Sequence, residues 1–213
     1  VFFAILVMIL AANLYVLTGD DHHSFAMDAE DKLIIADTKS TPGWGAVMMR
    51  RLEFHLSYEC AQRCAFCSES GRMARFADRP VSAREIAAVL ATKRRSCDHV
   101  TWTGGEPTAH PAFLGALRAA RGLGYRNYVT SNGGRLSEPG FASKALPLID
   151  ELCLSVHGDR ADVHDRLTGA PGSYERLQAA LDRAQAAPRL FLLTNTVISK
   201  LNASRAEAIL RSI

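Results

Sequence analysis

Five short apolar runs that alternate with amphipathic stretches predict an α/β fold with a parallel sheet. Polar or glycine-containing segments follow these runs where strands would end, and cap residues flank the amphipathic stretches. The chain has 213 residues, of which 48% are hydrophobic and 22% are charged, enough for one domain with a sizeable core. We therefore expect about five βα units within residues 51–213.

The positions of these elements follow from the apolar pattern and from cap residues. We expect strands at 52–57, 99–103, 127–130, 151–156 and 190–198, and helices at 82–95, 111–121, 138–146, 174–186 and from 202 to the end. Ser82 and Glu85 form a capping-box pattern at the first of these helices. We expect Ser173 and Asn202 to cap the last two helices, and Gly122 to help end the second.

Residues 1–50 are predicted to form a separate N-terminal segment, with a short apolar element and then a turn-rich region. The apolar run 1–17 is slightly short for a membrane-spanning helix, is interrupted by Asn13 and lacks the basic start of a signal peptide. We expect a buried strand or helix here, with a membrane anchor or mis-started translation as the alternatives. Because the first residue is Val1, we expect the chain to be a fragment. The pair His22-His23 is typical of a polar turn rather than of a metal site.

Three of the five cysteines, Cys60, Cys64 and Cys67, fall within eight residues directly after the first expected strand. This grouping favours a metal site in a reducing compartment over a disulfide framework. Thiolates select zinc, copper(I) or iron–sulfur clusters. A structural zinc ion needs a closed shell of four ligands, whereas a cubane cluster held by three cysteines keeps one iron open. Cys97 and Cys153 lie in apolar runs and are expected to be buried free thiols.

The C-x3-C-x2-C spacing of these cysteines resembles the radical S-adenosylmethionine (radical SAM) superfamily. The segment 104–107, Gly-Gly-Glu-Pro, strengthens the resemblance because it follows the second expected strand, as a similar motif does in that family. The resemblance extends from about residue 52 to about residue 202. It implies a partial (β/α) barrel of the radical SAM type, with about five of the usual six βα units and a core that is incomplete at its C-terminus.

The resemblance also implies two cofactors and their ligands. Cys60, Cys64 and Cys67 would bind three irons of a [4Fe-4S] cluster, and the open iron would bind S-adenosyl-L-methionine (SAM). Phe66 would lie against the adenine of SAM, with simple packing as the equally weighted alternative.

The glycine motif and the later strand ends supply the other implied contacts to SAM. The carbonyl groups of Gly104 and Gly105, together with Glu106, would accept hydrogen bonds from the ammonium group of SAM, and Pro107 would fix the turn. Further positions matching the family's strand ends are Ser131 and Asn132, for the ribose or carboxylate of SAM, and Ser155.

His157 stands where the family usually has an aspartate. It is interpreted as a proton donor, a substrate ligand or a hydrogen-bonded structural histidine. Arg166 is a candidate partner for a carboxylate, with an exposed ion pair as the simpler interpretation.

The location of the special segments supports one shared site, independently of any family. The cysteine loop, the glycine motif and the segments 131–133, 155–158 and 194–196 each lie at or near the carboxyl end of an expected strand. In α/β barrels, ligands bind at the carboxyl ends of the strands. We therefore expect all of these segments to meet at one edge of the sheet.

The function implied by the resemblance is that of a radical SAM enzyme. It would cleave SAM reductively to a 5′-deoxyadenosyl radical that abstracts hydrogen from a peptide or small-molecule substrate, using no catalytic residue beyond the cluster. Flavodoxin or ferredoxin would donate the electron, and a cytoplasmic location is expected. The net charge of +3 is too small to favour nucleic acid. The alternative is an iron–sulfur or zinc-binding module without SAM chemistry, in which His55 or His110 completes a zinc site.

Overall fold

A single eight-stranded sheet organises this computed structural model, which describes residues 5–10, 13–17, 37–38, 51–76 and 80–213. The strand order is β2-β1-β8-β7-β6-β5-β4-β3. Five neighbouring strands run parallel: β4 (Arg51–Ser57), β5 (His99–Gly104), β6 (Arg126–Ser131), β7 (Glu151–Ser155) and β8 (Phe191–Ile198). The predicted α/β class is confirmed, and each predicted parallel strand ends within one residue of the observed one.

Antiparallel strands extend the sheet at both edges. β1 (Ile5–Leu10) and β2 (Asn13–Leu17) pair with each other, and β1 pairs with β8. At the other edge, β3 (Asp37–Thr38) pairs with β4. The apolar run at the N-terminus thus includes two strands of the same sheet, while a domain division at residue 50 stays a prediction. His22 and His23 lie outside the described residues.

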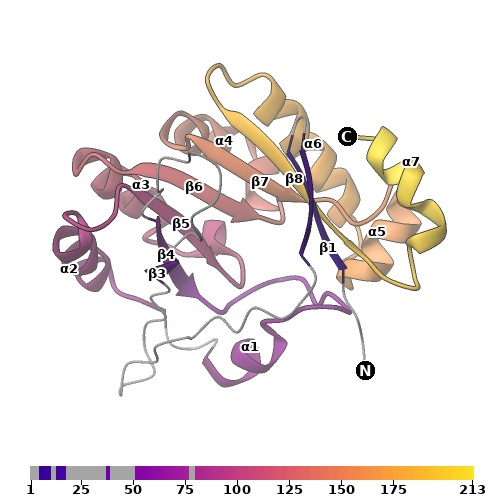
Figure 1. Ribbon diagram of the computed structural model, residues 1–213, viewed down its shortest axis with the longest axis horizontal. Coiled ribbons are helices and arrows are strands. Elements are labelled where there is room, and N and C mark those ends of the chain that lie inside the picture. The colour runs from indigo at the N-terminus through magenta and orange to yellow at the C-terminus, as the bar shows by residue number, and fades with distance from the viewer. Residues whose placement is uncertain (1–4, 11–12, 18–36, 39–50, 77–79) are drawn as a thin grey trace.

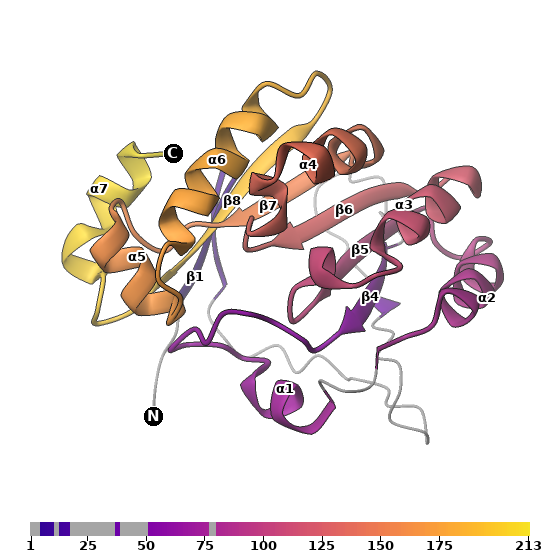
Figure 2. The same ribbon diagram turned by 180° about the vertical axis from the view of Figure 1, so that it is seen from behind.

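Helices cover one face of the sheet, as Figures 1 and 2 show from opposite sides. The expected ones are α2 (Ala83–Lys93), α3 (Phe113–Gly122), α4 (Pro139–Ala145), α6 (Ser173–Gln185) and α7 (Ala206–Arg211). Two further helices, α1 (Ser70–Phe76) and α5 (Ala161–Thr168), were not predicted, and α1 lies apart from the others (Figure 1), with Met73 and Ala74 on the wall of the cavity described below. Short 3₁₀ turns complete the list: η1 (Pro107–Ala109), η2 (Arg135–Ser137), η3 (Leu146–Leu148) and η4 (Ala203–Arg205). Among the described helices, none combines the length and apolar character needed to cross a membrane.

Alternation along β4 separates an apolar face of the sheet from a polar one. Leu52, Phe54 and Leu56 are almost fully buried in the main core, which also contains side chains of α2, α3 and α6. Glu53 and His55 alternate with them and therefore point to the opposite face. The helix-covered face thus forms the core, and the other face is left to line a cavity.

The cap predictions had different outcomes. The capping box is confirmed, because Ser82 accepts from Glu85 N–H and the Glu85 side chain accepts from Ser82 N–H. The prediction that Ser173 caps α6 is wrong. Ser173 is the first residue of that helix, and the carboxylate of Asp165 in α5 accepts hydrogen bonds from Gly172 N and Tyr174 N, at 2.6 and 2.8 Å.

The prediction that Asn202 caps the last helix with its side chain is also wrong. Asn202 is fully buried, and its Nδ2 donates to the carbonyl oxygens of His157 and Val197, at 3.0 and 2.9 Å. Its Oδ1 accepts from Ser199 N at 2.7 Å. Asn202 therefore ties the end of β8 to the segment after β7, at the edge of the sheet where the predicted site lies.

Candidate functional site

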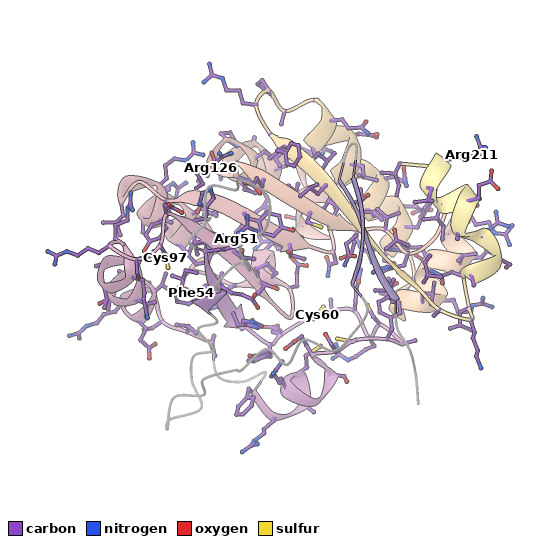
Figure 3. All side chains as sticks on the ribbon, viewed as in Figure 1. Arg51, Phe54, Cys60, Cys97, Arg126 and Arg211 are labelled. Carbon is purple, nitrogen blue, oxygen red and sulfur yellow. The ribbon has the colours of Figure 1, made fainter. Side chains whose placement is uncertain are left out.

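A cavity of about 730 Å³ opens at the carboxyl ends of the parallel strands. This volume is in the range of small-molecule sites. The loop that follows β4 lines the cavity, and Figure 3 places Cys60 in this loop, away from the core residue Phe54. All of the predicted site residues except Pro107 line the cavity: Cys60, Cys64, Phe66, Cys67, Gly104, Gly105, Glu106, Ser131, Asn132 and Ser155. Pro107 is buried at the start of η1 instead.

Backbone hydrogen bonds fix the cysteine loop against α5. Arg63 N–H donates to the carbonyl oxygen of Thr168 at 2.8 Å, and Ala65 N–H donates to that of Leu167 at 2.9 Å. Gly169 follows with a φ of 61°, and a Cβ there would lie 2.9 Å from Arg63 O. Backbone contacts with the end of α5 therefore hold the loop that carries the thiols in position.

The glycine turn after β5 packs directly against the same loop. Gly105 N–H donates to Ser57 O at 2.9 Å. A Cβ on Gly104, whose φ is 120°, would lie 2.2 Å from Ser57 O, and one on Gly105 would lie 2.4 Å from Glu59 O. Real Cβ atoms do not approach backbone so closely, so only glycine lets the two turns meet in this way.

Burial keeps two thiols of the cysteine loop neutral unless a metal takes the place of their protons. Burial raises the pKa of Cys60, and burial together with the nearby Cys60 and Cys67 sulfurs raises the pKa of Cys64 to about 12. Such thiols stay protonated at neutral pH unless a metal replaces the proton. Their soft sulfur atoms, on the wall of one cavity, fit the donor set that an iron–sulfur cluster requires.

Glu106 links the turn after β5 to the turn after β6. Its carboxylate is fully buried and accepts from Thr108 Oγ1 at 2.6 Å, Ser131 Oγ at 2.8 Å and Asn132 N at 2.8 Å. Burial raises the pKa of Glu106, and these hydrogen bonds oppose that effect. The hydroxyl of Ser131 also accepts from Gly133 N. Glu106 and Ser131 therefore hold the two turns together.

Asn132 connects the turn after β6 to the cysteines. Its Nδ2 lies 3.7 Å from Cys60 Sγ, within hydrogen-bond range for sulfur, and its Oδ1 accepts from Gly134 N at 2.8 Å. Because Glu106 holds the backbone N–H of Asn132, the amide side chain is oriented toward the sulfur. Asn132 is thus a hydrogen-bond donor to a predicted cluster ligand.

Phe66 and His157 pack together on the cavity wall. Their rings meet edge to face with centroids 4.5 Å apart, and His157 Nδ1 accepts from Val197 N at 3.2 Å. Burial, reinforced by the neighbouring His164, lowers the pKa of His157 to about 3. His157 is therefore a neutral imidazole at physiological pH, and its hydrogen bond to Val197 fits the interpretation of a structural histidine, while the roles of proton donor and substrate ligand stay predictions.

The buried histidines predict a loss of stability in mild acid. Burial lowers the pKa of His157 to about 3 in the folded state, whereas it is near 6.5 in the unfolded chain. The unfolded state therefore binds more protons between these values, so stability is full above pH 6.5 and falls as the pH falls below it. At pH 5 we expect the free energy of unfolding to fall by about 2 kcal/mol from His157 alone. Urea denaturation at pH 7 and at pH 5 measures the free energy of unfolding at each pH. In His157→Gln the difference between the two values should be smaller than in the wild-type protein. An equal difference in the variant would contradict the prediction.

Other sequence-based candidates lie elsewhere. Arg166 donates to the carbonyl oxygen of Leu201 at 3.4 Å and does not line the cavity. His110 is buried behind the glycine turn, where its Nδ1 accepts from Ala112 N. Across the described residues, no three His, Cys, Asp or Glu side chains converge as the ligands of one metal ion would. Cys97 and Cys153 are buried free thiols, as predicted.

Sequence analysis missed part of the cavity wall. Glu53 was not considered, and His55 was considered only as a zinc ligand, yet both line the cavity and His55 Nε2 lies 2.8 Å from Glu53 Oε1. Tyr58 and Asn195 also line it. The available signal was the alternation of Glu53 and His55 with apolar residues in the first strand.

Curated relatives share part of this chain's sequence. A protein named probable GTP 3′,8-cyclase, from Thermococcus kodakarensis, is 31% identical over 160 residues, which are 71% of this chain and 48% of that protein. The PqqA peptide cyclase of Rhizobium meliloti is 33% identical over 129 residues, which are 58% of this chain and 33% of that protein. The chain therefore spans less than half the length of these two relatives.

Solved structures share the fold. TYW1 with a bound lysine-pyruvate adduct superposes with a TM-score of 0.58 and 16% identity, over 79% of this chain and 66% of that one. SuiB of Streptococcus suis bound to S-adenosylmethionine superposes with a TM-score of 0.53 and 20% identity, over 65% and 32%. The fold is that of a partial radical SAM barrel.

The sequence profile that describes the Radical SAM superfamily matches residues 55–213, which is most of the chain. The match includes the cysteine loop, the glycine turn and every parallel strand after β4. The cavity, the fold and the relatives agree with it. The chain belongs to the radical SAM superfamily and is an enzyme of that family.

Proposed function

We propose that this chain cleaves S-adenosyl-L-methionine reductively at a [4Fe-4S] cluster and uses the resulting radical on a peptide or small-molecule substrate. The observation that carries the proposal is that the three cysteines of one loop and the glycine turn packed against that loop all line the same cavity. When bound, the reduced cluster supplies the electron that splits SAM into methionine and a 5′-deoxyadenosyl radical, which takes a hydrogen atom from the substrate.

The residues of the chain bind and orient the reactants in this proposal. Cys60, Cys64 and Cys67 hold the cluster as thiolates. The glycine turn brings backbone to the place where the ammonium group of SAM binds, and Glu106 keeps this turn in register with Asn132. The cavity wall shields the radical from water.

The substrate and the partners are proposed at the level of chemical class. The name of one relative states that it acts on a peptide and that of another that it acts on GTP, which supports either a peptide or a small molecule here. A one-electron donor such as flavodoxin or ferredoxin would reduce the cluster. A cytoplasmic location fits a reduced cluster and free thiols.

Anaerobic reconstitution tests the proposal. The purified chain is loaded with iron and sulfide, reduced with dithionite and incubated with SAM. We expect 5′-deoxyadenosine and methionine to accumulate together, as measured by liquid chromatography and mass spectrometry. Iron and zinc are quantified in the same sample. An intact cluster without SAM cleavage would favour the alternative of an iron–sulfur module, and bound zinc in place of iron would favour a zinc module.

The amide of Asn132 predicts an effect on the cluster's reduction potential. A hydrogen bond to a cysteine sulfur stabilises the reduced, more negative state, and Asn132 Nδ2 is 3.7 Å from Cys60 Sγ. The midpoint potential should be highest with Asn132 and lower in Asn132→Ala, which lacks the donor. It should be lowest in Asn132→Asp, because aspartate puts a negative oxygen beside the sulfur. At a fixed potential we expect the ratio of reduced to oxidised cluster to be roughly tenfold lower in Asn132→Asp than in the wild-type protein. This corresponds to a midpoint potential that is lower by about 59 mV.

A redox titration followed by electron paramagnetic resonance measures this potential without relying on activity. Asn132→Asp retains the oxygen that accepts from Gly134 N, so the turn itself is preserved. Equal midpoint potentials in all three proteins would show that the amide does not act on the cluster.

A further inference from the structure

Helix α1 is attached to the cysteine loop and not to the hydrophobic core. It begins at Ser70, whose N–H donates to the carbonyl oxygen of Cys67 at 3.4 Å. None of its seven residues is buried, and Figures 1 and 2 show it apart from the helices that cover the sheet. Its last residue, Phe76, contacts Tyr58, which precedes the cysteines, with ring centroids 6.1 Å apart. The helix therefore meets the chain on both sides of the cysteine motif.

One face of α1 is turned toward the rest of the protein. Its partly buried residues are spaced as one helical face: Arg72, Met73 and Phe76. The other four residues of the helix are exposed. The guanidinium of Arg72 donates to both carboxylate oxygens of Glu69, at 3.0 and 3.1 Å. Met73 is thus the apolar side chain on this face that lies between the ion pair and the aromatic contact.

The thioether of Met73 contacts a predicted cluster ligand directly. Met73 Sδ lies 3.9 Å from Cys67 Sγ, and both residues line the cavity. Once Cys67 binds iron as a thiolate, no proton remains to be shared between the two sulfur atoms, so the contact becomes an apolar one. A thioether is polarizable and only a weak acceptor. Met73 therefore occupies space beside this sulfur that water would otherwise fill.

The other two ligand sulfurs have polar neighbours. Cys60 Sγ accepts from the amide of Asn132 at 3.7 Å, and Cys64 Sγ lies 3.5 Å from Gln62 Oε1. The third sulfur instead meets the thioether. An apolar shell around a metal centre limits the access of water and lowers the local dielectric constant. The cysteine loop thus has one ligand position whose surroundings differ from those of the other two.

Resting on the proposed function, we infer that Met73 shields the Cys67 side of the cluster from water and thereby keeps its reduction potential low. Reduction adds a negative charge, which water stabilises better than a thioether does. Excluding water at this sulfur disfavours the reduced state, so the reduced cluster gives up its electron more readily. Met73 is a positioning residue in this account, because it acts through Cys67.

A redox titration followed by electron paramagnetic resonance tests the inference on wild-type protein, Met73→Ala and Met73→Leu, each loaded anaerobically with iron and sulfide. In Met73→Ala water reaches Cys67. At a fixed potential we expect the ratio of reduced to oxidised cluster to be roughly tenfold higher in this variant, which corresponds to a midpoint potential higher by about 59 mV. Leucine keeps most of the apolar volume, so Met73→Leu should stay close to the wild-type potential.

Loss of the cluster in air provides a second measurement that does not depend on activity. The visible absorbance of the cluster is followed in air-saturated buffer. We expect it to decay about tenfold faster in Met73→Ala than in the wild-type protein, because oxygen and water reach the iron held by Cys67. The decay in Met73→Leu should stay close to that of the wild-type protein.

Gly71 supplies a matched control on the same helix. It is exposed, does not line the cavity, and a Cβ there would meet nothing within 4 Å. Gly71→Ala favours the helix, as Met73→Ala does not disfavour it, and should leave the potential and the decay unchanged. Wild-type potential and decay in Met73→Ala would overturn the inference. So would a Met73→Leu protein that behaves like Met73→Ala, because leucine retains the shielding volume.

SAM cleavage by the wild-type preparation is measured alongside. Cleavage together with an unchanged potential in Met73→Ala removes only the role of Met73. A shifted potential in Met73→Ala without cleavage by the wild-type protein removes only the proposed function.

Discussion

Replacing any one of Cys60, Cys64 or Cys67 with serine is expected to abolish SAM cleavage. Serine is close to cysteine in shape, so the loop should keep the hydrogen bonds that join Arg63 to Thr168. The hydroxyl is a poor ligand for a soft iron–sulfur centre, so the cluster should be lost or held weakly. Iron content, visible absorbance and 5′-deoxyadenosine production measure the effect in each variant.

Cys97 provides the control for this result. It is a buried free thiol in the main core, under the helices rather than in the cavity wall. Cys97→Ala should lower stability modestly and keep the iron content of the wild-type protein. If a loop variant retained full iron and full cleavage, the three-thiolate assignment would be wrong.

Gly105→Ala is expected to disrupt the site through the backbone. The new Cβ would lie 2.4 Å from Glu59 O and 2.7 Å from the carbonyl carbon of Tyr58. Both are backbone atoms, which cannot move aside as the end of a flexible side chain can. The turn and the cysteine loop must therefore separate. We expect the free energy of unfolding to fall by about 3 kcal/mol, and SAM cleavage to fall roughly 100-fold, because displacement by about 1 Å misplaces reacting groups.

Gly115 is the matched control for the same substitution. It lies within α3, and a Cβ there would meet nothing within 4 Å. Gly115→Ala should therefore raise stability by about 1 kcal/mol, since alanine favours a helix. Urea denaturation and SAM cleavage are measured for both variants. If the two variants had the same stability and the same SAM cleavage, the close backbone approach at Gly105 would not be needed for function.

Local patterns were enough to predict much of this fold. Apolar runs located the five parallel strands, and the capping box at Ser82 was readable because both partners lie within one turn. Helices α1 and α5 were missed because they are short, at seven and eight residues. α1 buries none of its residues, and the apolar repeat of α5, Val163 and Leu167, extends over only two turns. The cap of α6 was wrongly assigned to Ser173 because the carboxylate that performs it, Asp165, belongs to another helix.

The candidate site was predictable where a motif is contiguous in sequence. The spacing of the cysteines and the glycine turn depend on residues close together in the chain, so both could be placed on one edge of the sheet. The contact between Asn132 and Cys60 joins residues 72 positions apart, and that between Glu106 and Ser131 spans 25. Such contacts depend on strand register, which no local pattern specifies.

The docking of the cysteine loop on α5 has a consequence for the proposed cluster when oxygen attacks it. Hydrogen bonds from Arg63 and Ala65 join the loop to the last turn of α5 through backbone atoms, without using the thiols. We therefore expect oxidative loss of the proposed cluster to leave the polypeptide scaffold folded. Iron and sulfide alone would then restore it, without new synthesis or chaperone-assisted refolding.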